Sequence, residues 1–348
     1  MWRKLLWASF ALAPLAVVLR FAVHAGDVVL FAISAAALLP LAWLIGEATE
    51  HAAEHTGPGI GGFLNASFGN APELIIALFA VSDSLPDVVR GSITGSVVSN
   101  ILLVTGFAIA LTKEENIDRA SLESQLGLVL AATLLFLIPS IPGWHGDPDR
   151  HSLQLASIPV AATLLALYVG YTIYGLRRHR RRHLQGEHAA PAQGWSLRAA
   201  LAVLAVATGA TAIVSEILVH SLDAFAESAG LSTFFVSVVI VALVGNASEH
   251  GGAIVIARRG KIRLASEIAI TSSAQVGLLV APAVALLSWA VSPALSLSFR
   301  PVEIATMGAA ALVAAWIMAD AKGKRWEGVV LVAVYAAAVL AYGLSGDR

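Results

Sequence analysis

Eleven apolar stretches, each close to the length that a helix needs to cross a bilayer, dominate this chain of 348 residues. A helix covers ~30 Å of hydrocarbon with about 20 residues. The stretches lie near residues 5–23, 27–48, 57–82, 86–112, 121–141, 153–176, 197–221, 231–257, 264–290, 301–319 and 327–344. Since 57% of the residues are hydrophobic and only 13% are charged, a soluble domain is excluded. We expect an all-α integral membrane protein with about 11 transmembrane helices in the lipid bilayer.

The first stretch and the absence of cysteine exclude a signal peptide and all sites that depend on thiols. The first stretch contains Arg20 and lacks a small-residue cleavage pattern, so residues 1–26 are expected to be a retained N-terminal transmembrane helix and not a signal peptide. The chain has no cysteine, which excludes disulfides, thiolate metal sites and thiol nucleophiles.

Lysine and arginine residues indicate the orientation of these helices, because they accumulate on the cytoplasmic side of membrane proteins. If the chain crosses the membrane eleven times from a cytoplasmic N-terminus, all but five of its 22 lysine and arginine residues lie in cytoplasmic segments. The five exceptions are Arg20, Arg90, Arg150, Arg300 and Arg348. We therefore expect a cytoplasmic N-terminus and an outside C-terminus. The formal net charge of −1 gives no indication of a nucleic acid partner.

A polar linker divides the chain into two halves. Residues 177–195 are basic and contain proline and glycine, in contrast to the apolar blocks on both sides. We interpret them as a basic cytoplasmic linker that anchors the protein, with binding of anionic lipid headgroups as the alternative. The halves are then a first five-helix repeat, residues 27–176, and a second five-helix repeat, residues 196–348.

The two halves share a short motif. Gly-Asn-Ala-Pro-Glu at Gly69–Glu73 recurs 176 residues later as Gly-Asn-Ala-Ser-Glu at Gly245–Glu249. At the same offset lie further polar positions: Ser96 with Ser272, and Ser99 and Asn100 beside Gln275. Each half therefore carries a broken apolar helix followed by a serine-rich apolar helix with one amide.

Five helices per repeat is an odd number, so the two copies must insert with opposite orientations. Secondary transporters built from inverted repeats place their ion site near the bilayer midplane, on discontinuous helices at the repeat interface. Interruptions by Gly69, Pro72 and Gly245 mark such helices here, and Pro72 also frees the carbonyl of Phe68. We expect an inverted 5+5 repeat plus one N-terminal helix, working by alternating access.

The residues at the two breaks provide oxygen atoms that suit a hard cation. Glu73 and Glu249 supply carboxylates, and ionisable residues inside a membrane are costly and mark functional sites. Ca²⁺ is normally held by 6 to 8 oxygens. When the cation leaves, two nearby carboxylates in a low dielectric cannot both stay ionised, so protons compete for the same groups. Such competition predicts an obligatory exchange of Ca²⁺ for H⁺.

The polar companions of the two glutamates have a functional and a structural interpretation. As ligands they complete the cation site. As structural groups, asparagines cap the breaks, amides link helices, and serines let helices approach closely. These candidates are Asn70, Asn246, Asn100, Gln275, Ser99 and Ser272.

Four stretches carry a resemblance to a known family: "GEATEHAAEHTGPGIGGFLNASFGNAPELIIALFA", "GSVVSNILLVTG", "VGNASEHGGAIVIA" and "SSAQVGLLVAP". They resemble the calcium/proton antiporters of the cation/calcium exchanger superfamily, over residues 46–289. The resemblance implies a ten-helix inverted-repeat core with one additional N-terminal helix, in which Glu73 and Glu249 bind Ca²⁺ and H⁺ in turn. Carried over by motif, the neighbouring site residues are Asn100, Gln275 and His250.

Two departures from related families bear on the transported ions. Sodium/calcium exchangers carry hydroxyls in Gly-Thr-Ser-like runs at the repeat motifs, whereas this chain has Gly-Asn-Ala. The difference favours protons as the counter-ion, with a sodium or potassium/proton antiporter on the same scaffold as the alternative. Some relatives have an acidic stretch between the halves. Because this linker is basic, we expect no Ca²⁺ binding there.

A second motif, His-Ala-Ala-Glu-His at His51–His55, matches the H-x-x-E-H pattern of some zinc proteases. An intramembrane metalloprotease with Glu54 as the base is therefore a minor alternative, and a solvated helix end is the structural one. Glu54 and His55 are also secondary candidates for a cytoplasmic mouth, which histidine would make sensitive to pH near neutrality. Two further acids are secondary candidates: Glu216 and Glu227.

Taken together, these features predict a secondary active transporter, not an enzyme, that exports cytosolic Ca²⁺ in exchange for protons. Its partners are Ca²⁺, H⁺ and the bilayer; no cofactor is expected, and assembly into a homo-oligomer is left open. The expected location is a prokaryotic inner (plasma) membrane, with a vacuolar membrane as the alternative.

Overall fold

The computed structural model describes residues 8–111, 115–183, 194–291, 293–320 and 322–347, without the side chains of residues 57–63, 65–67, 115, 116 and 176–183. The basic linker therefore lies almost entirely outside the described side chains. The first-half helices are α2 (Leu12–Val18), α3 (Asp27–Gly69), α4 (Ala71–Ser82), α5 (Pro86–Val98), α6 (Thr105–Ala110), α7 (Arg119–Gly143) and α8 (His151–His183). The second-half helices are α9 (Leu197–His220), α10 (Leu222–Ala229), α11 (Thr233–Phe235), α12 (Ala242–Gly245), α13 (Ala247–Arg258), α14 (Ile262–Gln275), α15 (Ala281–Val291), α16 (Pro301–Ile317) and α17 (Arg325–Ser345).

Four π-helical turns and two short strands complete the described elements. The turns are η1 (Leu19–Val23), η2 (Ser99–Val104), η3 (Val236–Val241) and η4 (Val276–Val280). Strands β1 (Glu115–Asn116) and β2 (Lys322–Gly323) pair antiparallel. Two of the turns occupy corresponding places in the halves, since η2 follows α5 and η4 follows α14. Such π-bulges often occur at functional sites.

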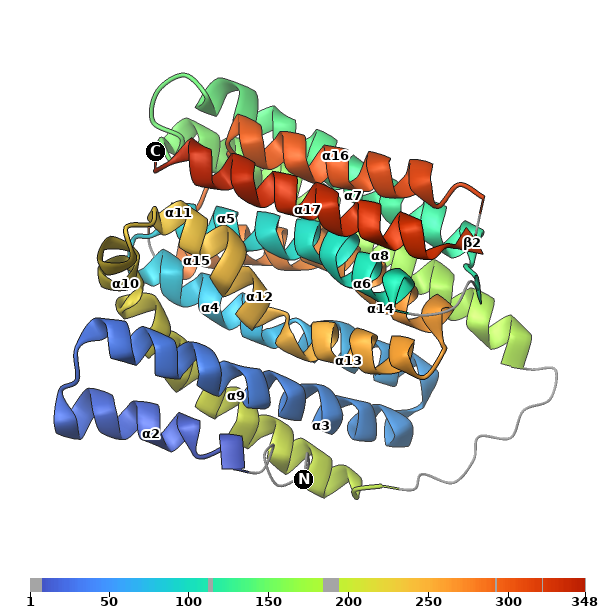
Figure 1. Ribbon diagram of the computed structural model, residues 1–348, viewed down its shortest axis with the longest axis horizontal. Coiled ribbons are helices and arrows are strands. Elements are labelled where there is room, and N and C mark those ends of the chain that lie inside the picture. The colour runs from blue at the N-terminus through green and yellow to red at the C-terminus, as the bar shows by residue number, and fades with distance from the viewer. Residues whose placement is uncertain (1–7, 112–114, 184–193, 292, 321, 348) are drawn as a thin grey trace.

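The helices run side by side in three layers (Figure 1). One outer layer contains α2, α3 and α9, which contact one another, and the opposite layer contains α7, α16 and α17. The broken helices lie between them: α4 contacts α9, α13 contacts α3, and α5 contacts both η3 and α16. The middle layer is thus covered on both sides, which keeps the polar residues at its helix breaks away from lipid.

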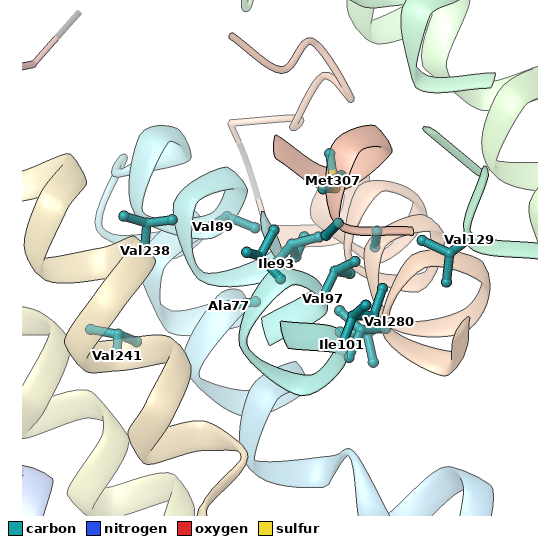
Figure 2. Packing of buried hydrophobic residues seen from close by; sticks show 14 of the residues in the cluster. Ala77, Val89, Ile93, Val97, Ile101, Val129, Val238, Val241, Val280 and Met307 are labelled. Carbon is teal, nitrogen blue, oxygen red and sulfur yellow. The ribbon is translucent and has the colours of Figure 1, made fainter. Parts of the chain in front are cut away.

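The core is built around α5 and η2. Val89, Ile93, Val97 and Ile101 are all buried and follow one another at intervals of four residues, so they form one stripe along this helix. Figure 2 shows the stripe among valines from η3, η4 and α7 and Met307 from α16. Both halves of the chain therefore contribute to a single core.

The two repeat motifs adopt the same local structure. Helices α4 and α13 each contain 12 residues, and both of their ends differ by the offset that separates the motifs. The preceding residues have similar backbone angles, with φ −97° and ψ 15° at Asn70 and φ −87° and ψ 13° at Asn246. The predicted helix breaks therefore occur at the two asparagines.

The number of membrane-crossing helices is confirmed only in part. Seven described helices are long and apolar enough to cross a membrane, or eight if α10 and the helix of residues 233–245, bent by 112°, form one span. Three shorter apolar helices correspond to the first, third and tenth predicted stretches. The second and third stretches were predicted as separate helices, but the structure has one helix, α3, from Asp27 to Gly69. Its segment Asp27–Thr56 is long and apolar enough to span a membrane.

Loops assigned to the same side of the membrane contact one another. The β1–β2 pair joins two loops that were both predicted to be cytoplasmic. On the opposite side, His220 Nδ1 lies 3.9 Å from Asp83 Oδ2, and Arg90 Nη1 lies 2.8 Å from Asp149 Oδ1. These contacts agree with the predicted alternation of the helices across the membrane.

The close approach of α5 to η3 and α12 depends on Gly95. A Cβ atom at this position would lie 1.9 Å from the carbonyl oxygen of Val238 and 2.6 Å from Cβ of Ala242. We expect Gly95→Ala to lower the free energy of unfolding by about 3 kcal/mol or more, because the two helices would have to separate. The measurement is the midpoint of thermal unfolding in detergent.

Gly209 in α9 provides the matched control, because a Cβ atom there would meet nothing within 4 Å. Gly209→Ala should leave the midpoint unchanged or raise it slightly, since alanine favours a helix over glycine by roughly 0.5–1 kcal/mol. Equal midpoints of thermal unfolding for Gly95→Ala and Gly209→Ala would show that the contact at Gly95 does not determine how closely α5 packs against η3 and α12.

Candidate functional site

The two motif glutamates lie in the first turns of α4 and α13. Both helices start inside the protein because the chain breaks at Asn70 and Asn246, and a carboxylate is favoured near a helix N-terminus by the helix dipole. Glu73 is buried and Glu249 is half-buried. The sequence therefore places one carboxylate at the start of each internal helix.

Each glutamate lies against the glycine of the opposite motif. A Cβ atom at Gly245 would lie 3.3 Å from Glu73 Cγ, and one at Gly69 would lie 3.9 Å from Glu249 Oε1. These two contacts bring both glutamates to the interface between the motifs. Glycine at both positions thus lets the motifs of the two repeats meet face to face.

Amide hydrogen bonds connect the repeats in the same reciprocal way. Asn70 Nδ2 donates to Gln275 Oε1 (3.0 Å), and Asn100 Nδ2 donates to Asn246 Oδ1 (3.1 Å). Each motif asparagine is therefore paired with the amide of the other repeat. Interhelical hydrogen bonds were suggested for Asn100 and Gln275, and the structure shows them for Asn70 and Asn246 as well. Neither motif asparagine caps the helix that follows it through its side chain.

Serine hydroxyls complete this network. Ser272 Oγ donates to Glu249 Oε2 and accepts a hydrogen bond from Asn100 Nδ2 (3.0 Å). Asn246 Nδ2 donates to Ser96 Oγ (2.6 Å). Ser96 was not among the predicted site residues, although its alignment with Ser272 in the repeat was a signal that could have identified it.

Several oxygens at the site have no partner. Both carboxylate oxygens of Glu73 and Oδ1 of Asn100 are buried and accept no hydrogen bond from another described residue. Within the described part of the chain, no lysine or arginine forms an ion pair with Glu73 or Glu249. Buried polar groups are normally satisfied, so these oxygens fit a site for a cation or protons.

One predicted ligand group is engaged elsewhere. Pro72 was expected to free the carbonyl of Phe68 for a cation, but this carbonyl accepts the backbone N–H of Asn70. Ser99 also turns away from the glutamates, because its hydroxyl donates to the backbone carbonyl of Ser96 (3.3 Å). The side chains therefore provide most of the oxygens at the site.

His250 follows Glu249 and is half-buried. Its Nε2 atom is buried and has no hydrogen-bond partner among the described residues.

The His51–His55 motif lies outside the site. His51 approaches Glu47 and Glu54 at 3.7 and 3.6 Å, and His55 Nε2 lies 2.7 Å from the carbonyl oxygen of Trp195. Among the residues that the structure describes, no group of three or more His, Asp or Glu side chains could hold a metal ion. Glu54 and His55 are exposed, but the motif lies inside α3 and not at the predicted helix end, because α3 continues to Gly69. The contacts of the two histidines do not support the zinc protease alternative.

The remaining two acidic candidates are exposed. Glu216 lies on α9 and Glu227 on α10, and both residues are exposed on the surface. Neither contributes a hydrogen bond to the network around Glu73 and Glu249.

Comparison with known proteins follows the same division into halves. Residues 27–176 and 199–343 match the family described as "Sodium/calcium exchanger protein". The chain belongs to this family. The resemblance expected from the motifs is therefore confirmed for most of the sequence. The fold can be compared with solved structures of relatives in the same family.

Relatives in the sodium/calcium exchanger family align with nearly the whole chain. The "Ca(2+)/H(+) antiporter ChaA" of Bacillus subtilis is 38% identical over 90% of this chain and 91% of its own. The "Ca(2+)/H(+) antiporter" of Aphanothece halophytica is 33% identical over 92% of this chain and 91% of its own. The solved structure of native YfkE is 32% identical and superposes with a TM-score of 0.84, covering 97% of this chain and 99% of that chain.

The cross-repeat network predicts a measurable contribution of Asn100. Asn100→Leu leaves the buried Oδ1 of Asn246 without its donor, so we expect a loss of about 1–3 kcal/mol of stability and weaker cation binding. Thermal unfolding in detergent, with and without Ca²⁺, measures both effects. Thr105→Val is the control, because Thr105 donates only to the backbone carbonyl of Asn100 in its own helix. Similar losses in the two variants would contradict the assigned network.

Proposed function

We propose that this protein is a Ca²⁺/H⁺ antiporter that exports cytosolic Ca²⁺ by alternating access. The names of its full-length relatives in Bacillus subtilis and Aphanothece halophytica support this activity. The observation that carries the proposal at the level of residues is the buried carboxylate of Glu73, which accepts no hydrogen bond from another described residue and lies at the same interface as Glu249. Because the chain belongs to a family of ion exchangers, it is a transporter and not the metalloprotease considered as an alternative.

The site works by competition between one divalent cation and protons. Two carboxylates neutralise the charge of one Ca²⁺, and Asn100 Oδ1 is an additional oxygen without a hydrogen bond from a described residue. When Ca²⁺ leaves, repulsion between the carboxylates in a low dielectric favours proton binding. The site therefore holds either the cation or protons whenever it opens to one side of the membrane.

Eleven crossing helices fit this mechanism. Seven long apolar helices, the bent pair and the three shorter apolar helices account for the eleven predicted stretches. The positive charge of the loops supports a cytoplasmic N-terminus and an outside C-terminus. We place the protein in a prokaryotic inner membrane, in agreement with the bacterial relatives.

The alternative cations are sodium and potassium. Sodium sites in related exchangers use hydroxyl groups at the repeat motifs, but here the nearby hydroxyls of Ser96 and Ser272 are hydrogen-bonded to Asn246 and Glu249. Their engagement favours Ca²⁺ and H⁺ as the exchanged pair.

Ion flux in everted vesicles tests the proposed function. A pH gradient, acidic inside, should drive ⁴⁵Ca²⁺ uptake, and Ca²⁺ added to acid-loaded vesicles should release protons. Na⁺ and K⁺ should release few or no protons under the same conditions. Vesicles that exchange protons for Na⁺ or K⁺ but not for Ca²⁺ would establish the alternative instead.

A further inference from the structure

Two threonines form hydrogen bonds between the repeats at some distance from the glutamates. Thr271 Oγ1 on α14 donates to Gln125 Oε1 on α7 (2.7 Å). Thr94 Oγ1 on α5 donates to Glu303 Oε1 on α16 (3.2 Å). Gln125, Thr94 and Glu303 are at most 3% exposed. Each bond joins the two halves of the chain, because α5 and α7 belong to the first repeat and α14 and α16 to the second.

The two bonds correspond to each other in the inverted repeat. The threonines, and likewise their acceptors, lie within two residues of the offset that separates the two motifs. In both pairs the threonine comes from the serine-rich helix of one repeat, and the acceptor comes from a long helix of the other. A contact that recurs in both halves follows from the architecture of the repeat and not from local packing alone.

Both threonines lie just before polar residues of the exchange site. Thr271 directly precedes Ser272, whose hydroxyl donates to the glutamate of the second motif, and it lies about one turn before Gln275. On the other helix, Thr94 lies less than two turns before Asn100. The threonine contacts therefore fix the rotation of the helical segments that lead into the two amides.

The helical structure beyond the amides does not fix this rotation in the usual way. Asn100 lies within η2, and Gln275 directly precedes η4. In a π-helical turn the backbone hydrogen bonds reach one residue further than in an α-helix. The regular α-helical pattern is therefore interrupted at both amides, so contacts with neighbouring helices must set where these side chains point.

The two acceptor side chains are themselves held in place. Gln125 Nε2 donates to Ser121 Oγ (3.0 Å), one turn earlier on α7. Glu303 Oε2 accepts the backbone N–H of Arg300 (2.6 Å) at the start of α16. Helices α7 and α16 contact each other in the same outer layer (Figure 1). This layer thus provides one frame against which both serine-rich helices are held.

We propose that Gln125 and Glu303 are positioning residues for the exchange site. Through Thr271 and Thr94 they hold α14 and α5 at the rotation that directs the amides of these helices to the motifs of the opposite repeat. Among the described hydrogen bonds, neither residue contacts a motif glutamate directly. The inference rests on the proposed Ca²⁺/H⁺ exchange and adds the residues that keep its site in shape.

The kinetics of Ca²⁺ uptake by reconstituted vesicles test this role. Gln125→Leu and Thr271→Val should each raise the KM for Ca²⁺ about tenfold and change kcat by no more than about twofold, because supporting partners of metal ligands act mainly on metal affinity. The double variant should show no larger effect than either single variant, since both changes remove the same bond. Thr271→Ser keeps the hydroxyl and should restore the wild-type KM.

Thr133→Val is the matched control. Thr133 is a buried threonine on α7, and its hydroxyl donates to the backbone carbonyl of Val129 in its own helix (2.9 Å). This variant should keep the wild-type KM. Thermal unfolding in detergent shows whether each variant is folded, and if Gln125→Leu is not, Thr271→Val provides the test with a side chain of nearly the same shape. Thr94→Val tests the second pair and should also raise the KM.

Three results would overturn the inference. A wild-type KM in both Gln125→Leu and Thr271→Val, even with lower unfolding midpoints, would show that this pair contributes only to packing. A double variant whose effect on KM is the product of the two single effects would show that the residues act separately. A wild-type KM in Thr94→Val would exclude the role of Glu303. Wild-type vesicles without any Ca²⁺ uptake would instead overturn the proposed function, and this role with it.

Discussion

Glu73→Gln is expected to abolish Ca²⁺ uptake driven by a pH gradient, and Glu249→Gln is expected to do the same. Glutamine keeps the size of the side chain but removes the charge that Ca²⁺ and H⁺ compete for. At about 4 Å, one pair of opposite charges is worth roughly 4 kcal/mol at an effective dielectric of 20. The loss corresponds to about a thousandfold weaker binding, measured as ⁴⁵Ca²⁺ uptake by reconstituted vesicles.

Two exposed acids serve as controls for this result. Glu216→Gln and Glu227→Gln change the same group outside the site, on α9 and α10, and should keep uptake within about twofold of the wild type. Thermal unfolding shows whether each variant is folded. If Glu73→Gln or Glu249→Gln exchanges Ca²⁺ at the wild-type rate, the two-carboxylate site is wrong. If Glu216→Gln abolishes uptake, the site is incomplete.

Arg90→Met is expected to lower the stability of the protein, because it breaks a buried network of charges. The Arg90 side chain is 1% exposed, and its guanidinium binds both carboxylate oxygens of Asp149 at 2.8 and 2.9 Å and Asp87 Oδ1 at 2.7 Å. Breaking a buried ion pair costs about 3–5 kcal/mol. Because the Asp149 and Asp87 side chains are 23% and 30% exposed, water recovers part of that loss, and we expect about 2–3 kcal/mol.

The midpoint of thermal unfolding in detergent measures this loss. Arg119→Met is the matched control, because its ion pair with Glu123 is exposed on both sides and should contribute about 0.5 kcal/mol or less. The Arg90 variant should therefore unfold well below the control. An Arg90 variant as stable as the Arg119 variant would mean that the network does not hold α5 to the loop before α8.

The repeat was the most informative feature of the sequence for the site. The recurrence of Gly-Asn-Ala-x-Glu predicted two broken helices, and the structure begins α4 and α13 at the same position of each motif. Residues that disfavour a continuous helix occur in both motifs, so local sequence, together with the repeat, located these two breaks. The positions of Glu73 and Glu249 at the helix starts follow directly.

Pairing across the repeats could not be derived from the sequence. The bonds of Asn70 with Gln275 and of Asn100 with Asn246 depend on how the two repeats are packed, and neither motif alone contains that information. For the same reason Ser99 was preferred over Ser96, whose hydroxyl accepts from Asn246. A strict use of the repeat offset would have favoured Ser96.

Long-range charge pairing was missed in the same way. Arg90 was counted only among the five basic residues that do not fall in cytoplasmic segments, yet it is the centre of a buried network with Asp87 and Asp149. Asp87 lies one helical turn from Arg90, but Asp149 is distant in sequence, and no local pattern connects it to Arg90. Continuous helical structure through Gly69 was also unexpected, because Gly57, Pro58 and Gly59 indicate an interruption.

Proton release on Ca²⁺ binding tests the central claim most directly. Purified protein in weakly buffered detergent solution should release protons when Ca²⁺ is added, because the cation displaces them from Glu73 and Glu249. The release should be absent in the Glu73→Gln/Glu249→Gln double variant and present in the Glu216→Gln control. Binding of Ca²⁺ to the wild type without proton release, or unchanged release from the double variant, would contradict competition at this site.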